Sequence, residues 1–184
     1  MSEGADGLIL VCAGAGGHAG TLSPFALVRE VREFFDGPIA LSGSISEGSS
    51  VLSALALGAD FAYVGTKFIA TEEANASPGY KQMIIDSTAD DIMYSATFTG
   101  VNGNYLRPSV EAAGLNPEEH TSGSKDDMNF STSAIAKKDN SSKAWKDIWG
   151  SGQGIGTIKD APSVQTAVDQ ICLLYTSPSP RDCT

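Results

Sequence analysis

The sequence predicts an α/β fold in which the strands of a parallel sheet alternate with helices. Three short apolar runs with strand-like composition occur in succession. Each run is followed by a turn rich in Gly, Ser or Thr, and then by residues with the spacing or end signals of a helix. This alternation is typical of βαβ units and a parallel sheet. Because the carboxyl ends of such strands carry the site, we expect the three turns to converge on one ligand.

The composition narrows the class of protein. The chain has 184 residues, enough for one domain with a sizeable core, and its 41% hydrophobic content is typical of a soluble globular protein. The net charge of -10 argues against nucleic acid as a partner, because proteins that bind phosphate backbones concentrate Lys and Arg. No apolar run approaches the ~20 residues needed to cross a bilayer, so no membrane association is expected.

The cysteines and the start of the chain bear on location. The three cysteines show neither metal-ligand spacing nor a disulfide framework. No basic segment followed by an apolar one is found at the start, which predicts that no secretion signal is present. We therefore expect a cytoplasmic protein that has no metal site.

The first strand–turn–helix unit opens with residues 8–12, an apolar run typical of a buried strand. Residues 13–20 follow and contain four glycines, which allow the backbone to pass close to a flat or anionic group. A helix is expected over residues 23–35, with Ser23 as N-cap and Pro24 at the first helical position. The sequence Asp-Gly-Pro that follows predicts its end.

The second and third units repeat this order. In the second, residues 39–41 form the strand, residues 42–46 form the turn, and a helix over residues 48–57 ends at Gly58. In the third, a strand over residues 61–64 leads through Gly65 and Thr66 to a helical stretch around residues 77–87. We expect all three strands to lie side by side.

The later part of the chain has weaker patterns. Residues 91–98 are consistent with a short strand, and residues 114 to about 142 read as a mobile polar excursion. Regular structure is expected again at residues 144–149. A glycine-rich turn at residues 150–156 and a helix over residues 163–171 follow.

The last segment, residues 172–184, resembles the conceptual translation of a sequencing adapter. We expect it to be an artefact without fixed structure and exclude it from the fold. A natural disordered tail rich in Ser and Pro is the alternative.

Two turns and one histidine carry candidate chemistry. Residues 42–44 and 65–66 suit a phosphate, because glycine exposes backbone N–H groups and Ser or Thr adds a hydroxyl donor. The alternative is that they are ordinary tight turns. His18 is one of two histidines and stands among the glycines of the first turn. It is a candidate for proton chemistry near neutral pH, or it caps a backbone carbonyl.

Several stretches of the chain, in their order and spacing, resemble the nitronate monooxygenase family, formerly called 2-nitropropane dioxygenases. The resemblance starts with Ala-Gly-Gly-His-Ala-Gly in the first turn and covers most of residues 4 to 171. The matching stretches are residues 15–20, 42–45, 55–60, 64–73 and 148–154.

This resemblance implies a TIM (β/α)8 barrel, truncated here to roughly the last three βα units plus a C-terminal helical segment. An eight-stranded barrel takes ~250 residues, so we expect this chain alone to be incomplete and prone to aggregate at its sheet edges. In this reading, residues 1–90 are the C-terminal part of an FMN-binding barrel. Residues 91–171 are an extension that packs near the flavin.

The family also implies the activity, an FMN-dependent oxidation of alkyl nitronates with O2 to carbonyl compounds and nitrite. By the resemblance, His18 is the catalytic residue of this flavoprotein oxidoreductase. Two departures weaken the match: Val11 stands where the family often has glutamine, and Ser44 stands where it usually has glycine. The cofactor-binding residues that the family implies are Gly16, Gly17, Gly43, Ser44, Tyr63, Val64, Gly65, Thr66 and Gln153.

Two other functions stay open. An FMN-dependent reductase of the enoyl-acyl-carrier-protein type shares the Gly-Gly-His turn. A non-catalytic phosphate-binding barrel fragment would use the same turns without the imidazole.

Overall fold

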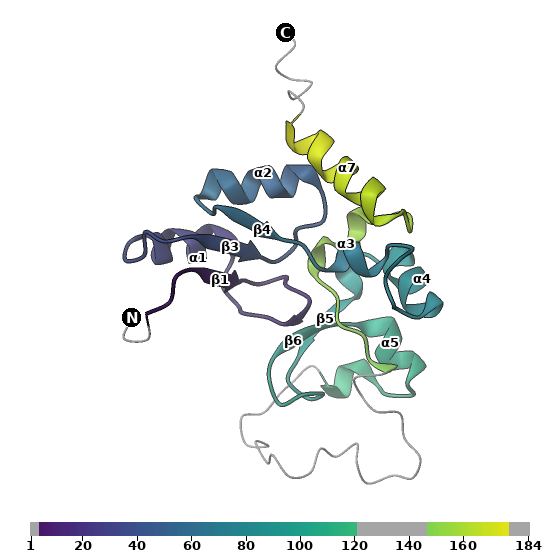
Figure 1. The fold of residues 1–184 in the computed structure, drawn as a ribbon. Coiled ribbons are helices and arrows are strands. Elements are labelled where there is room, and N and C mark those ends of the chain that lie inside the picture. The colour runs from purple at the N-terminus through teal and green to yellow at the C-terminus, as the bar shows by residue number, and fades with distance from the viewer. Residues whose placement is uncertain (1–3, 121–146, 177–184) are drawn as a thin grey trace.

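The computed structural model of the chain describes residues 4–120 and 147–176 (Figure 1). The expectations for most of the polar excursion, for residues 144–146 and for residues 177–184 of the adapter-like segment lie outside these ranges. Residues 172–176, which were expected to lack fixed structure, instead continue the last helix, α7 (Val164–Thr176). Within the described ranges the fold is α/β, as predicted, with two three-stranded sheets.

The first sheet is parallel and has the order β1-β3-β4. Leu10 lies opposite Leu41, which in turn lies opposite Ala62. These side chains belong to the main core, together with Val28 and Ala54 of the two helices that follow β1 and β3. The strands are β1 (Leu8–Val11), β3 (Ile39–Ser42) and β4 (Phe61–Tyr63), and the helices are α1 (Pro24–Arg32) and α2 (Gly48–Leu57).

The capping signals act as the sequence predicts. The Ser23 hydroxyl accepts a hydrogen bond from the Ala26 N–H, and Gly58 ends α2 in the left-handed conformation at φ 107°. Helix α1 ends at Arg32, three residues before the predicted end. The reason is that the Arg32 guanidinium binds the carbonyls of Phe35 and Gly37, which fold back outside the helix.

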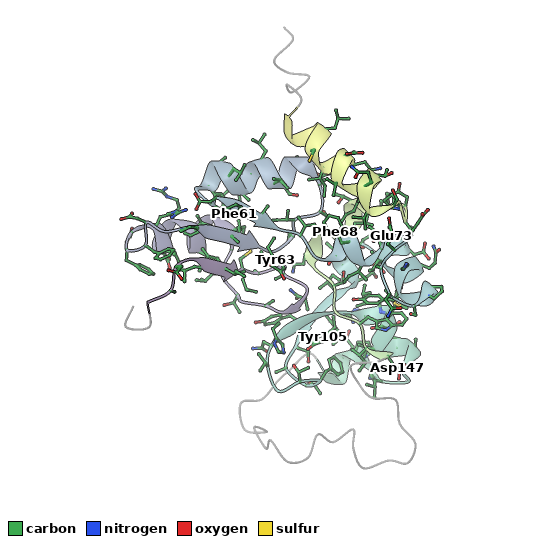
Figure 2. All side chains as sticks on the ribbon, viewed as in Figure 1. Phe61, Tyr63, Phe68, Glu73, Tyr105 and Asp147 are labelled. Atoms are coloured by element: carbon green, nitrogen blue, oxygen red, sulfur yellow. The ribbon has the colours of Figure 1, made fainter. Side chains whose placement is uncertain are left out.

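The second face of the parallel sheet stays exposed. Side chains alternate along a strand, so Ile9 and Val11 of β1 share this face with Phe61 and Tyr63 of β4. Ile9 is 60% exposed and Phe61 is 61% exposed. Figure 2 shows Phe61 and Tyr63 along the strand. The sheet therefore has a core face covered by helices and an apolar face open to solvent.

The second sheet is antiparallel and has the order β2-β6-β5. The sequence predicted only a strand near β5. All four residues of β6 are buried, although Gly103 and Asn104 have low strand propensity. The strands are β2 (Gly17–His18), β5 (Ile92–Ser95) and β6 (Gly103–Leu106).

The remaining elements connect and cover the two sheets. α4 begins after Ser77, whose hydroxyl caps it by accepting from the Tyr80 N–H, and it matches the helical stretch expected around residues 77–87. α3 and α5 were not predicted because they are short. The carboxylate of Glu73 accepts hydrogen bonds from the N–H of Val164, the first residue of α7, at 2.9 and 3.0 Å. α7 lies beside α2 (Figure 1). These elements are α3 (Thr66–Ile69), α4 (Pro78–Asp86), η1 (Ala89–Asp91), α5 (Arg107–Ala112), η2 (Pro117–His120), η5 (Gln153–Thr157) and α7 (Val164–Thr176).

No helix in residues 4–120 and 147–176 is both long and apolar enough to cross a membrane. The same residues contain no group of three or more His, Cys, Asp or Glu side chains that could hold a metal ion.

Candidate active site

The turns that follow the three parallel strands line one pocket with a volume of about 270 Å³. The three turns therefore lie together, as predicted, and the ligand that they would share stays a prediction. The glycine-rich segment around residues 150–154 forms a further wall, and Tyr80 of α4 contributes its side chain. The pocket brings together seven of the residues proposed from the sequence: Gly16, Gly17, Gly43, Ser44, Tyr63, Gly65 and Thr66.

Three other predicted residues do not line this pocket. Val64 follows Tyr63 directly, so its side chain points to the opposite face and packs against the main core. Gln153 contributes its backbone N–H, which donates to the Gly14 carbonyl at 2.9 Å, while its side chain is exposed. His18 is exposed and lies one residue beyond Gly17.

Glycine has different roles at different points of the pocket. A Cβ on Gly43 would lie 2.3 Å from the Cys12 sulfur, so packing requires glycine there. A Cβ on Gly17 or Gly65 would meet no atom within 4 Å and would project into open space. At these two positions the missing side chain leaves room for a bound molecule to approach the backbone.

Ser44 is the only non-glycine residue with a positive φ, 55°, in the part of the chain that the structure describes. The left-handed region is costly for a residue with a Cβ. Ser44 is held there by a hydrogen bond of 3.1 Å from its N–H to the Gly14 carbonyl. The turn therefore keeps the backbone conformation that a glycine would adopt without strain.

The segment 150–154 is joined to the first and third turns through backbone contacts. The Gly152 N–H donates to the Thr66 hydroxyl at 3.0 Å. A Cβ on Gly16 would lie 2.8 Å from the Gly152 nitrogen, so the two backbones are in direct contact. On the other side, the buried Asn104 amide of β6 donates to the Ala15 carbonyl at 2.7 Å. The first turn is therefore held by the segment 150–154 on one side and by β6 of the second sheet on the other.

Tyr80 was not proposed from the sequence, although it contributes to the pocket wall. Its ring stacks on Trp149 with a centroid distance of 4.8 Å, and its hydroxyl donates to the Gly150 carbonyl. Burial raises the pKa of Tyr80 to about 12, so the phenol is neutral near pH 7 and acts as a donor. No local pattern marks Tyr80, because its role depends on a partner 70 residues away.

His18 is held by the second sheet. It lies opposite Gly103 in the β2–β6 pair, and its Nε2 is 3.2 Å from the Thr99 hydroxyl oxygen. The next residue, Ala19, accepts a hydrogen bond of 2.9 Å from the Tyr94 hydroxyl. The imidazole is thus close to the Gly17 edge of the pocket and available to solvent. This arrangement can bind an anion at the turns and exchange a proton beside them.

The comparisons with known proteins agree with this geometry. The nitronate monooxygenase family matches residues 1–173. A nitronate monooxygenase of Paraburkholderia phytofirmans is 30% identical over 125 residues, which are 63% of this chain and 34% of that protein. FabK from Thermotoga maritima has a TM-score of 0.69 at 25% identity, covering 94% of this chain and 55% of that chain.

A nitroalkane oxidase from Streptomyces ansochromogenes has the same fold, with a TM-score of 0.65 at 24% identity. That match covers 95% of this chain and 54% of the oxidase. The chain thus spans about a third of the length of the P. phytofirmans relative and about half of each of the two structures. Since the family match extends over most of the chain, the chain belongs to the nitronate monooxygenase family.

Proposed function

We propose that this chain carries the phosphate-binding turns and the catalytic histidine of an FMN-dependent nitronate monooxygenase. The observation that carries the proposal is the shared pocket at the ends of β1, β3 and β4, with His18 next to Gly17. The proposed substrates are an alkyl nitronate and O2, and the proposed products are a carbonyl compound and nitrite. Membership of the family supports this reaction.

The pocket residues fit the phosphate end of FMN. Gly65 directly precedes α3, and Thr66 is the first residue of this helix. Backbone N–H groups in the first turn of a helix have no partner within the helix. The Thr66 hydroxyl accepts from Gly152 and keeps its own proton for a ligand oxygen. The open space above Gly17 and Gly65 would admit a flat or anionic group. The volume of the whole pocket, about 270 Å³, lies just below the roughly 300–1,000 Å³ usual for small-molecule sites. A pocket of this size suits one end of a larger ligand.

The roles of the protein groups follow from this placement. FMN held at these residues would supply the redox chemistry between the nitronate and O2, which belongs to the cofactor. Gly43, Ser44, Gly65 and Thr66 would hold the phosphate, and Gly16 and Gly17 would let the ring approach. His18 would take a proton from the carbon of a neutral nitroalkane where that is the substrate. Val64 and Gln153 would contribute only through their backbones.

We further propose that the parallel sheet is part of a (β/α)8 barrel, with residues 1–90 in the barrel and residues 91–171 as its extension. The apolar face carrying Ile9, Val11, Phe61 and Tyr63 supports this, because side chains on the inner face of a barrel are covered by the other strands. The free thiol of the buried Cys12 is compatible with a cytoplasmic location.

The test is to purify the complete enzyme that contains this chain and identify its cofactor by mass after denaturation. With the nitronate of 2-nitropropane, we expect nitrite release and O2 uptake without added NADH. The His18→Gln variant should keep its FMN but lose turnover of neutral nitroalkanes. NADH oxidation without nitrite release would instead favour the reductase alternative. Full activity of H18Q on all substrates would remove His18 from the mechanism.

A further inference from the structure

One hydroxyl connects His18 to the core of the second sheet. Thr99 lies in the turn between β5 and β6, and its Oγ1 is 3.2 Å from the Nε2 of His18. The same oxygen is 3.0 Å from the Val101 carbonyl oxygen and 3.2 Å from the Tyr105 hydroxyl. The Val101 N–H, at 3.4 Å, is the most distant of the four groups around it.

The proton inventory of these groups limits their roles. A threonine hydroxyl has one proton to donate and two lone pairs that accept. The Val101 carbonyl can only accept and is the group nearest to Oγ1, so we assign the Thr99 proton to it. Thr99 is then an acceptor toward His18, which requires the imidazole proton to be on Nε2. The other ring nitrogen, Nδ1, has no hydrogen-bond partner among the described residues, and it keeps its lone pair in the neutral ring.

Tyr105 keeps the exposed Thr99 in place. Its side chain is 6% exposed and packs edge-on against Phe98 at a centroid distance of 5.0 Å. Figure 2 marks Tyr105 in the lower sheet. With the Thr99 proton directed to Val101, the second lone pair of Thr99 is shared by the Tyr105 hydroxyl at 3.2 Å and the Val101 N–H at 3.4 Å. A surface hydroxyl is thus held by a core residue as well as by its own turn.

We propose that Thr99 is a positioning residue that holds His18 in the Nε2–H tautomer and leaves Nδ1 as the atom that accepts the substrate proton. The role of Nδ1 as proton acceptor rests on the proposed function, whereas the tautomer of His18 does not. In that step the C–H bond of a neutral nitroalkane breaks and an Nδ1–H bond forms. The electron pair stays on the substrate as the nitronate, and the imidazole becomes a cation. Thr99 takes no part in bond making and acts only through His18.

The first test observes the tautomer directly. The complete enzyme is labelled with ¹⁵N-histidine, and two-bond ¹H–¹⁵N correlation spectra are recorded at a pH where His18 is neutral. The H18Q variant identifies the His18 signals. We expect the Nε2–H pattern in the wild type and in Thr99→Ser, and a larger share of the Nδ1–H tautomer in Thr99→Val. An Nδ1–H pattern in the wild type would overturn the assignment.

The second test separates positioning from general damage by the choice of substrate. A nitronate supplied as the anion needs no proton removal, whereas the neutral nitroalkane does. We expect T99V to lower kcat on the nitroalkane by about three- to tenfold, the usual value of one hydrogen bond, and to leave nitronate oxidation unchanged. T99S should restore the rate. Thr97→Val is the matched control, because the Thr97 hydroxyl contacts Ser95 in the same turn.

The outcomes distinguish this inference from the proposed function. If T99V equals T97V on the nitroalkane, or if it lowers both substrates equally, Thr99 does not position a base. If the wild type oxidises nitronates but not neutral nitroalkanes, Nδ1 is not a catalytic base. If the wild type oxidises neither, the proposed function fails, and the tautomer spectra still decide whether Thr99 orients the ring.

Discussion

The two sheets of this protein build the candidate site in different ways. The parallel sheet has one face packed on α1 and α2 and the other exposed, and the turns at its strand ends supply the pocket lining. The antiparallel sheet is centred on β6, whose four residues are all buried. The Asn104 side chain of β6 and the pairing of β6 with β2 hold the first turn in place. The binding surface and its support therefore come from separate parts of the fold.

Glycine shows the same difference at the level of single atoms. A Cβ on Gly103 in β6 would lie 2.7 Å from the Gly17 carbonyl oxygen and 2.9 Å from its carbon. A Cβ on Gly65 in the third turn would meet nothing within 4 Å. The absence of a side chain thus permits backbone contact in one sheet and leaves space for a ligand in the other. Two substitutions to alanine, at Gly103 and at Gly65, test this difference.

The largest effect is expected from Gly103→Ala. The added methyl group would push Gly17 and His18 away from β6, because the contacting atoms are backbone and cannot rotate aside. Overpacking of this kind costs about 1–3 kcal/mol. We expect a lower midpoint of thermal unfolding for the complete enzyme, together with weaker FMN binding measured by flavin fluorescence. An unchanged midpoint and unchanged affinity would mean that the β2–β6 contact does not support the site.

Gly65→Ala should affect the cofactor without affecting the fold. The backbone of Gly65 has a negative φ of -114°, and the surrounding space is open, so the apo protein should unfold at the wild-type midpoint. The methyl group would occupy the space assigned to the phosphate, and we expect FMN affinity to fall at least tenfold, or about 1.4 kcal/mol. Retained affinity in G65A, measured beside G103A, would place the phosphate elsewhere.

The same contrast explains what the sequence could predict. The parallel half depends on local signals, such as the Ser23 cap and the glycine at position 58, which act within a few residues. The second sheet pairs Gly17 with Asn104, two residues far apart in the chain that do not favour strands. Their conformation is set by burial and pairing, which no local pattern shows. Helix α3 is one turn long, too short for a periodic signal.

The residues of the candidate site also fall into a group that the sequence could predict and a group that it could not. The convergence of the turns at Gly17, Gly43 and Gly65 follows from strand order, and a sequence of alternating strands and helices reveals it. The contributions of Tyr80 and Asn104 depend on single hydrogen bonds to distant backbone carbonyls. The family resemblance suggested Gln153, and the structure indicates how its backbone joins the first turn. The roles of these residues toward FMN stay predictions.

Replacing Ser44 should have a smaller effect on stability than Gly103→Ala, and in the opposite direction. Replacing it by glycine removes the cost of a Cβ at φ 55°, so Ser44→Gly should stabilise the protein by about 1 kcal/mol. Ser44→Ala is the matched control, because it keeps the Cβ and loses only the hydroxyl. We expect S44G to raise the unfolding midpoint and S44A to leave it nearly unchanged. Equal FMN affinity in wild type and S44A would show that the Ser44 hydroxyl does not bind the phosphate.

The smallest expected effect concerns the support of the parallel sheet by Asp60. One oxygen of its carboxylate accepts from the Ile39 N–H at 2.8 Å and from Arg32 at 2.6 Å. These two contacts, the Ile39 N–H first and Arg32 second, lower the pKa of Asp60 below its ordinary value. A lowered pKa in the folded state gives stability that is present above the ordinary carboxyl pKa and is lost as the pH falls through the lowered one.

Asp60→Asn should therefore lower the unfolding midpoint near neutral pH, and the difference from wild type should shrink as the solution becomes acidic. Because Asp60 is exposed to solvent, salt should also weaken the Arg32 contribution. Asp86→Asn is the control for loss of one surface charge, since Asp86 accepts a single hydrogen bond from Gln82. If D60N differs from wild type by the same amount at every pH, the carboxylate supports the sheet through shape and not through charge. None of the ion pairs in the described residues has a carboxylate that accepts from a backbone N–H of β2, β5 or β6, so the stability of the antiparallel sheet should depend less on pH than that of β1, β3 and β4. Hydrogen exchange measured strand by strand at two pH values would test this difference.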